Sequence, residues 1–525
     1  MLERLFSRPS SGTGSRIVPL ICVPLSFFAG VAYCLRFRPD VRPFAIDNQI
    51  YFFMAERVAS GVPPHISMVD HKNALSSLVS GLAIAIGRWL DLDDATSVRI
   101  VSCAATGATV AAVWLLTWRL RGRQIDAHVA ALSMFVFVDF FVQGSQGVRP
   151  KLFMAMFMSV GLAAHAAGHL FRSGLLSISA FLCWQPALLV PACLGVSTLL
   201  EPPRVQRALR FGGAALLAIV AYELYFVIHG AIGEQLYQTY VMPTREEAWP
   251  VPPLAKSFDF LWRLGHPRQD WSFVLPINFM AALAALAIAC IVRPATVLRR
   301  LAASSAWSGV VASGAAAWAF TMVNHQAYPD LFFLYPFFAV AAGITVGLIV
   351  ELLGRIRPAA LATAARTAAV ILLAGAVAHI AWSRRTIYRI GGNLNLNDQR
   401  ALASVVKGFE TAGDRVWAIG CVHLLALERM PNFLPYGLLI DPNIRAYMLS
   451  KAGGGPFIPL NANDELPTKI LVARGGERRV MPWLPRLYSK VTDEAFARQG
   501  ISMWALRTDA DIARVLEIIR QAQLR

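Results

Sequence analysis

The stretch LFFLYPFFAVAAGITVGLIVELL, from Leu331 to Leu353, contains a single charged residue, Glu351. A helix of about 20 apolar residues spans the hydrocarbon core of a bilayer, so this stretch predicts a transmembrane helix. Comparable apolar windows recur along the chain at roughly 17–35, 98–119, 127–146, 151–171, 210–229, 273–292, 303–323 and 362–383. The sequence therefore predicts a polytopic membrane protein.

The composition of the whole chain agrees with this prediction. Of the 525 residues, 56% are hydrophobic and only 15% are charged, and the mean hydropathy is +0.51. Soluble domains carry about 25% charged residues. The seven cysteines are scattered without metal-ligand spacing, and we interpret them as small apolar residues. These features exclude a soluble enzyme, a disordered chain and a disulfide scaffold.

Two apolar segments differ from a simple membrane span. Segment 74–90 is short, and segment 174–200 is interrupted by Gln185-Pro186 and Pro191, a pattern typical of two half-helices. We expect 74–90 to lie on or dip into the outer leaflet, and 174–200 to enter and leave on the cytoplasmic side. The predicted fold is an all-α polytopic membrane domain over residues 1–383, with about 11 membrane crossings including two short half-helices.

Arginine clusters set the orientation, because short cytoplasmic loops are enriched in Lys and Arg. The net charge of +17 is carried beside apolar runs, which argues against nucleic acid as a partner. In this topology the N-terminus is cytoplasmic together with four clusters: Arg119, Arg121 and Arg123; Arg204, Arg207 and Arg210; Arg293, Arg299 and Arg300; and Arg355 and Arg357. If segments 74–90 and 174–200 each span once instead, the first cluster lies outside, but everything after residue 200 keeps its side.

Residues 384–525 have a different pattern from the rest of the chain. A polar helical pattern over 398–411 is followed by short β-like runs at 415–420, 469–473 and 503–507, and by an amphipathic helical pattern over 509–524. The sequence therefore predicts a small C-terminal extracytoplasmic α/β domain.

The first outer loop, residues 37–97, holds the most informative polar residues. Apolar residues recur with helical spacing at Ile50, Phe53, Met54 and Val58. This spacing predicts an amphipathic helix that begins near Asp47 and lies flat on the membrane. Asp47 is a candidate base, and its alternative role is that of an N-cap. The two roles conflict, because a helix N-terminus lowers the pKa of a carboxyl and makes it a weaker base.

Two basic segments are candidates for binding an anion. The same outer loop continues through Asp70-His71-Lys72, for which a solvated loop is the alternative. Arg149 and Lys151 lie in a turn that the topology places outside, against the positive-inside tendency. Outer turns do carry stray basic residues, but an arginine can bind phosphate through two hydrogen bonds and a lysine adds a point charge.

A third polar segment, NHQAYPD, lies between two apolar spans. It contains His325, Tyr328 and Asp330. These residues either form an ordinary polar turn or line a pocket.

In layout the chain resembles the GT-C superfamily of integral-membrane glycosyltransferases, which use polyprenyl-phosphate sugars. It is similar in order to protein O-mannosyltransferases and aminoarabinose transferases. The resemblance is carried by a series of segments in order: IDNQIYFFMA, ASGVPP, DHKNAL, SVRIVS, RGR, RPKLFMA, CWQPALL and YPDLFFLYP. A C-terminal extracytoplasmic domain also matches.

The resemblance implies a multi-pass transferase of a bacterial inner or plasma membrane. It would move a hexose or pentose from a polyprenyl-phosphate donor to an extracytoplasmic glycan, lipid or protein, with inversion. Asp47 would be the general base, and Lys72, Arg149 and Lys151 would lie near the donor phosphate. The other candidates would line the substrate pocket: Tyr51, Asp70, His71, His325, Tyr328 and Asp330. No metal ligand is assigned, and a divalent metal is left open.

Other functions fit the same sequence features. A lipid-linked oligosaccharide polymerase or ligase would differ in donor size only. A transporter or flippase would use a broken helix such as that at Gln185-Pro186 and an acidic residue such as Glu223 within a span. The chain shows no repeated halves, however, and a transporter has little need for a large outer domain. A non-catalytic anchoring protein is the third alternative.

Overall fold

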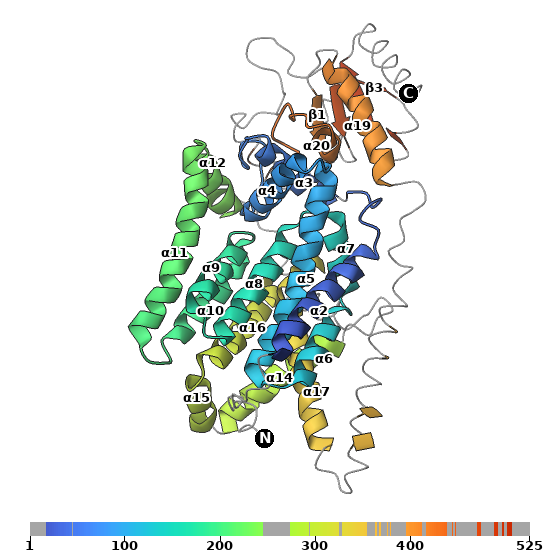
Figure 1. The fold of residues 1–525 in the computed structure, drawn as a ribbon. Coiled ribbons are helices and arrows are strands. Elements are labelled where there is room, and N and C mark those ends of the chain that lie inside the picture. Colours follow the sequence, from blue (N-terminus) through green and yellow to red (C-terminus); the bar gives the residue numbers. More distant parts are fainter. Residues whose placement is uncertain are drawn as a thin grey trace.

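The computed structural model describes residues 17–44, 46–244, 274–292, 294–324, 328–353, 395–411, 416–437, 470–473, 488–491 and 501–506, and a few single positions between these ranges. The described residues form a long helical bundle with an α/β region at one end (Figure 1). The chain is therefore mostly helical, as predicted.

Within the described residues, six helices are long and apolar enough to cross a membrane: α2 (Ile17–Leu35), α5 (Asp94–Arg121), α11 (Arg204–Ile228), α14 (Val274–Val292), α16 (Ser305–Asn324) and α17 (Tyr335–Leu353). Helices α6 (Gln124–Met134) and α7 (Val138–Gln146) make a seventh candidate span, bent by 61° between them. These helices confirm a polytopic membrane protein.

Shorter apolar helices occupy two further predicted windows. They are α8 (Pro150–Ala166), α9 (Leu170–Phe181) and α10 (Leu189–Thr198), the last preceded by the 3₁₀ helix η2 (Gln185–Leu188). The break between α9 and η2 lies just before Pro186, which has no amide hydrogen to donate. The count of about eleven crossings depends on these short helices and stays a prediction. Its last window, 362–383, lies almost entirely outside the described residues.

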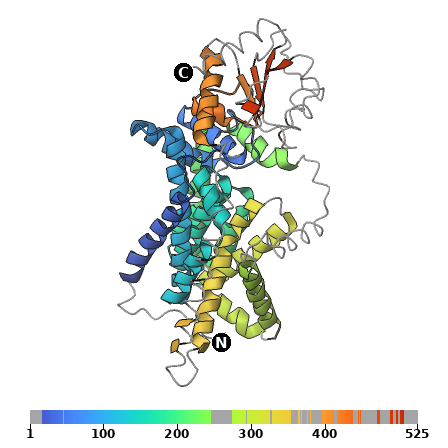
Figure 2. The same ribbon diagram turned by 90° about the vertical axis from the view of Figure 1, so that its right-hand side faces the viewer.

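One end of the bundle carries the α/β region, and the other carries arginine-rich elements. Helices α3 (Ile46–Ala59), α4 (Leu75–Trp89) and α12 (Ile232–Leu236) lie at the end that carries the α/β region (Figures 1 and 2). The turn between α5 and α6, the start of α11, and α15 (Pro294–Ala302) lie at the opposite end (Figure 1). Two of the predicted cytoplasmic arginine clusters, and Arg299 and Arg300 of a third, belong to these last elements and so share one end of the described bundle.

The C-terminal region contains α19 (Leu396–Thr411), α20 (His423–Leu427) and a four-stranded sheet. The strands are β1 (Val416–Ile419), β2 (Ile470–Ala473), β3 (Tyr488–Val491) and β4 (Ser502–Leu506), in the order β1-β2-β4-β3. β1 and β2 are parallel, and the other two pairs are antiparallel. Three strands and α19 were predicted from the sequence, whereas β3 and α20 were missed. The predicted helix 509–524 lies outside the described residues.

Helix α3 packs between α4 and α20, and every residue from Asn48 to Arg57 is buried. The helix therefore has no apolar face of its own exposed to lipid, although the amphipathic pattern predicts one. The C-terminal region covers the face that was expected to be polar. The exposed apolar face belongs to α4 instead, where Leu82 and Ile86 point outwards and Trp89 is 83% exposed.

Candidate functional site

Asp47 lies in the first turn of α3, one residue after the helix begins, rather than at its N-cap. Its carboxylate forms an ion pair with Arg149, with Nη2 and Oδ2 2.6 Å apart. Arg149 is the residue that precedes α8, so the pair joins the starts of two helices. The arginine side chain is 11% exposed and the aspartate side chain 45%. The carboxylate is therefore held on one side and accessible on the other.

Asn48 fixes the turn that carries Arg149. The amide Nδ2 of the buried Asn48 donates to the carbonyl of Val148 at 3.1 Å, and Gly147 gives the turn its left-handed φ of 115°. A side chain at Gly147 would meet the ring of Phe44 at 3.3 Å. Asn48 was not among the predicted site residues, although a second polar side chain directly after Asp47 at the start of the helix was the available signal.

Lys72 approaches α3 one turn further along. Its Nζ donates to the hydroxyl of Tyr51 at 2.7 Å and lies 5.4 Å from the centre of the Tyr51 ring. Burial alone would lower the pKa of Lys72, but Tyr51, Asp70 and Asp47 raise it well above its ordinary value. The ammonium group is therefore held charged. Asp70 is buried, and His71 Nδ1 lies 3.9 Å from its carboxylate, so the alternative of a solvated loop does not hold.

The loop that carries Lys72 is tied down by two glutamines. Gln185 Nε2 donates to the carbonyl of His71 at 2.6 Å, and Gln238 Oε1 accepts from the backbone amide of Asp70 at 3.3 Å. Gln238 Nε2 also donates to the carbonyl of His65 at 2.8 Å. Gln185 marked a helix break in the sequence. In the structure its side chain also positions the basic loop.

Lys151, in the first turn of α8, forms an ion pair with the buried Asp330 and lies 5.0 Å from the centre of the Trp184 ring. Asp330 belongs to the 3₁₀ helix η6 (Tyr328–Phe333). Asp330 therefore joins the site through Lys151. His325 lies outside the described residues, and so does the side chain of Tyr328, which begins η6.

The three cations act on one carboxylate. Burial alone would raise the pKa of Asp47, but the charges of Arg149, Lys72 and Lys151 together bring it below its ordinary value. Such coupling falls with distance, so Lys72 and Lys151 lie in the neighbourhood of the Asp47–Arg149 ion pair. Around the partly exposed carboxylate, Arg149 is in direct contact, Lys72 bonds to Tyr51 and Lys151 pairs with Asp330. The site can therefore bind an anion beside a group able to accept a proton.

The described residues contain no group of three or more His, Cys, Asp and Glu side chains placed to hold a metal ion. The neighbouring acidic residues Asp93 and Asp94, at the start of α5, have structural partners. Asp93 caps α5 by accepting from the amide of Thr96 at 3.1 Å, and Asp94 pairs with Arg88 at 2.7 Å.

This fold, a helical bundle with an α/β region at one end, is similar to that of solved GT-C membrane glycosyltransferases. ArnT from Cupriavidus metallidurans bound to undecaprenyl phosphate matches with a TM-score of 0.55 and 12% identity, over 94% of this chain and 98% of that chain. Its apo state matches with a TM-score of 0.57 and 10% identity, over 96% and 99%.

A second solved protein has the same fold. The archaeal oligosaccharyltransferase AglB from Archaeoglobus fulgidus, in complex with an inhibitory peptide and a dolichol-phosphate, matches with a TM-score of 0.53 and 11% identity. The match covers 94% of this chain and 75% of that chain. No protein-family model matches the sequence, and no curated protein does. The predicted resemblance to the GT-C superfamily is confirmed at the level of the fold.

Proposed function

We propose that the protein is a membrane glycosyltransferase that moves a sugar from a polyprenyl-phosphate donor to an acceptor. The observation that carries the proposal is the carboxylate of Asp47 paired with Arg149 and coupled to Lys72 and Lys151. The fold adds support, because the similar solved proteins hold undecaprenyl phosphate and dolichol-phosphate. A lipid donor keeps its tail in the bilayer and its anomeric carbon near the headgroups. The site, where the bundle meets the α/β region, suits that position.

In the proposed reaction the oxygen of an acceptor hydroxyl attacks the anomeric carbon while Asp47 takes its proton. The bond between that carbon and the phosphate oxygen breaks, and the polyprenyl phosphate leaves with the electron pair. Attack opposite the leaving group inverts the anomeric configuration. Lys72, Arg149 and Lys151 stabilise the negative charge that gathers on the phosphate.

The low pKa of Asp47 does not conflict with its role as a base. In the empty site the cations keep the carboxylate ionised. A bound phosphate shares those cations and adds negative charge, so the pKa of Asp47 rises when the donor is present. The donor therefore makes Asp47 a stronger base.

The proposal includes the orientation of the chain in a bacterial inner or plasma membrane. The end opposite the α/β region holds the turn after α5, the start of α11, and α15 (Figure 1). These elements carry arginine clusters. By the positive-inside tendency that end is cytoplasmic, as is the N-terminus. The site and the C-terminal region then face outside, where glycan, lipid or protein acceptors are found.

The enzymatic alternative, a polymerase or ligase of lipid-linked oligosaccharides, uses the same site with a larger donor. The transporter alternative is less well supported. Gln185, at the break that suggested a transport pathway, holds the loop of Lys72 through the carbonyl of His71. The break therefore has a role in forming the site.

The proposed activity is tested with full-length protein in nanodiscs and undecaprenyl-phosphate hexoses and pentoses labelled in the sugar. Membrane extracts supply acceptors. We expect one donor to release undecaprenyl phosphate with transfer of label to the extract, and empty nanodiscs to release none. Movement of an intact donor between leaflets of proteoliposomes, without cleavage, would support a transporter and contradict the proposal.

We expect Arg149→Gln to move the acidic limb of the kcat/KM profile to higher pH. The limb reports the base of the free enzyme, which must be deprotonated. Burial raises the pKa of Asp47, and Arg149, Lys72 and Lys151 lower it. Without Arg149 only the two lysines oppose the effect of burial, so the pKa of Asp47 rises. We expect wild-type activity to persist to a pH below the ordinary pKa of aspartate, and the variant to lose activity at a higher pH. The profile is measured by release of undecaprenyl phosphate, and an unmoved limb would exclude Asp47 as the titrating base.

A further inference from the structure

We infer that the C-terminal region positions Asp47 by holding the chain on both sides of it, with Gln399 and His423 as positioning residues. This inference rests on the proposed function, because it concerns the group proposed as the base. Neither residue touches the reacting atoms in this account. Each acts through α3 and the segment that leads into it.

The first contact follows Asp47 by two residues. Gln49 is fully buried, and its Nε2 donates to the carbonyl of Gly420 at 2.7 Å. Its Oε1 bonds with Nδ1 of His423, the first residue of α20. Since an amide oxygen can only accept, His423 carries its proton on Nδ1 in this contact. Both partners of the Gln49 amide thus come from the C-terminal region.

The second contact precedes Asp47 by three residues. Gln399, on α19, forms two hydrogen bonds with the backbone of Phe44: Oε1 accepts from the amide at 2.9 Å, and Nε2 donates to the carbonyl at 3.3 Å. The Phe44 ring stacks on Phe52 of α3, with centroids 4.3 Å apart, and lies 4.7 Å from the guanidinium of Arg99. Phe44, shortly before α3, is therefore held in both backbone and side chain.

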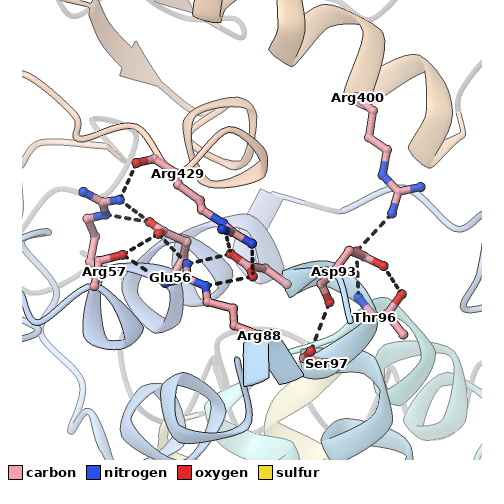
Figure 3. A network of polar contacts seen from close by, with 10 residues as sticks. Glu56, Arg57, Arg88, Asp93, Thr96, Ser97, Arg400 and Arg429 are labelled. Atoms are coloured by element: carbon pink, nitrogen blue, oxygen red, sulfur yellow. Dashed lines mark hydrogen bonds and ion pairs between the residues drawn. The ribbon is translucent and has the colours of Figure 1, made fainter. Parts of the chain in front are cut away.

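The far end of α3 is held by a network of charges (Figure 3). Glu56 is buried and pairs with Arg57 at 2.6 Å and with Arg88 at 2.9 Å. Arg88 also pairs with Asp94, which Arg429 reaches at 3.2 Å. Arg57 Nη2 donates to the carbonyl of Arg429 at 2.7 Å. This end of α3 is thus joined to α4, α5 and the C-terminal region.

These contacts matter because α3 is short. A helix of this length is marginal without tertiary contacts, and its ends fray first. Asp47 lies at one such end, while catalytic groups must be placed to within about 0.5 Å. A displacement of about 1 Å costs on the order of 100-fold in rate. Contacts at Phe44 and Gln49 remove the freedom that the first turn of α3 would otherwise have.

The test compares His423→Ala with two matched variants in full-length protein in nanodiscs. His423→Asn keeps an N–H group for Gln49. Arg400→Ala removes a cation next to Gln399 on α19 whose ion pair with Asp93 is exposed, so it should contribute little. Two quantities are measured: hydrogen exchange of backbone amides in peptides covering residues 46–52 without substrate, and kcat and KM for release of undecaprenyl phosphate from the donor.

We expect His423→Ala to speed exchange in these peptides and to lower kcat by roughly 10- to 100-fold, with the donor KM within about threefold of wild type. His423→Asn should restore part of both, and Arg400→Ala should change neither. Combined with Asp47→Asn, His423→Ala should add less than about threefold, because both changes remove the same contribution. If His423→Ala expresses poorly, Gln399→Ala on α19 takes its place in the test. We expect it to give the same faster exchange and lower kcat.

Unchanged exchange in both His423→Ala and Gln399→Ala would overturn the inference. Faster exchange with an unchanged kcat would overturn it as well, since the helix would be held without consequence for the reaction. A fully active Asp47→Asn variant is a different result. It refutes the proposed base, while the exchange data still show whether the C-terminal region holds the start of α3.

Discussion

Asp47→Asn is expected to lower kcat for sugar transfer by about 10²- to 10⁴-fold, the usual contribution of a general base. The asparagine has nearly the same size and can still accept a hydrogen bond from Arg149, so the pair that joins α3 to α8 is retained in shape. Its amide cannot take the proton of the acceptor hydroxyl. The measurement is release of undecaprenyl phosphate under single-turnover conditions with saturating acceptor extract.

The matched control is Asp40→Asn, in the same outer loop. Asp40 forms an exposed ion pair with Arg38 at 2.8 Å, which contributes little in water. This variant should behave as wild type. If Asp47→Asn stays within about tenfold of wild type at a normal membrane level, Asp47 is not the base.

Lys72→Met is expected to lower kcat by about 10²- to 10³-fold, the typical loss when one preorganised donor to a developing anion is removed. Methionine is similar in length and can keep the apolar contact with the Tyr51 ring, so the change chiefly removes the charge. Lys151 is a less clean choice. Its removal would also break the ion pair with the buried Asp330, which is costly by itself.

Tyr51→Phe separates the hydrogen bond of Lys72 from its charge. The phenylalanine keeps the ring below the ammonium and removes only the hydroxyl that accepts from it at 2.7 Å. We expect a loss of less than about tenfold, in line with a single hydrogen bond. If Tyr51→Phe and Lys72→Met lower kcat equally, the contribution of Lys72 comes from its structural hydrogen bond to Tyr51 and not from its charge on the leaving phosphate.

The helices of the bundle could be predicted because a membrane span is encoded locally. Runs such as 331–353 and 17–35 must satisfy their backbone hydrogen bonds internally, so length and apolar content suffice. The short strands near Val416 and Ile470 also carry their own pattern. The burial of α3 on all sides could not be predicted in this way, because one side is covered by α20, hundreds of positions later in the chain.

The candidate site was partly visible for a related reason. Arg149 and Lys151 are basic residues in a turn that the topology places outside, and Asp47 and Lys72 stand out as charged residues in the first outer loop of a charge-poor chain. The supporting amides gave no comparable signal. In the sequence, nothing distinguishes Gln49 from an ordinary polar residue of a helix. Its partner His423 lies 374 positions away. Hydrogen bonds over such separations leave no periodicity in the sequence.

A structure determined by cryo-electron microscopy with undecaprenyl phosphate bound tests the central claim most directly. We expect phosphate density within hydrogen-bond distance of at least two of Lys72, Arg149 and Lys151, with the carboxylate of Asp47 facing the phosphate oxygen to which a sugar would be attached. Phosphate density at the opposite end of the bundle, or out of reach of all three cations, would contradict the claim.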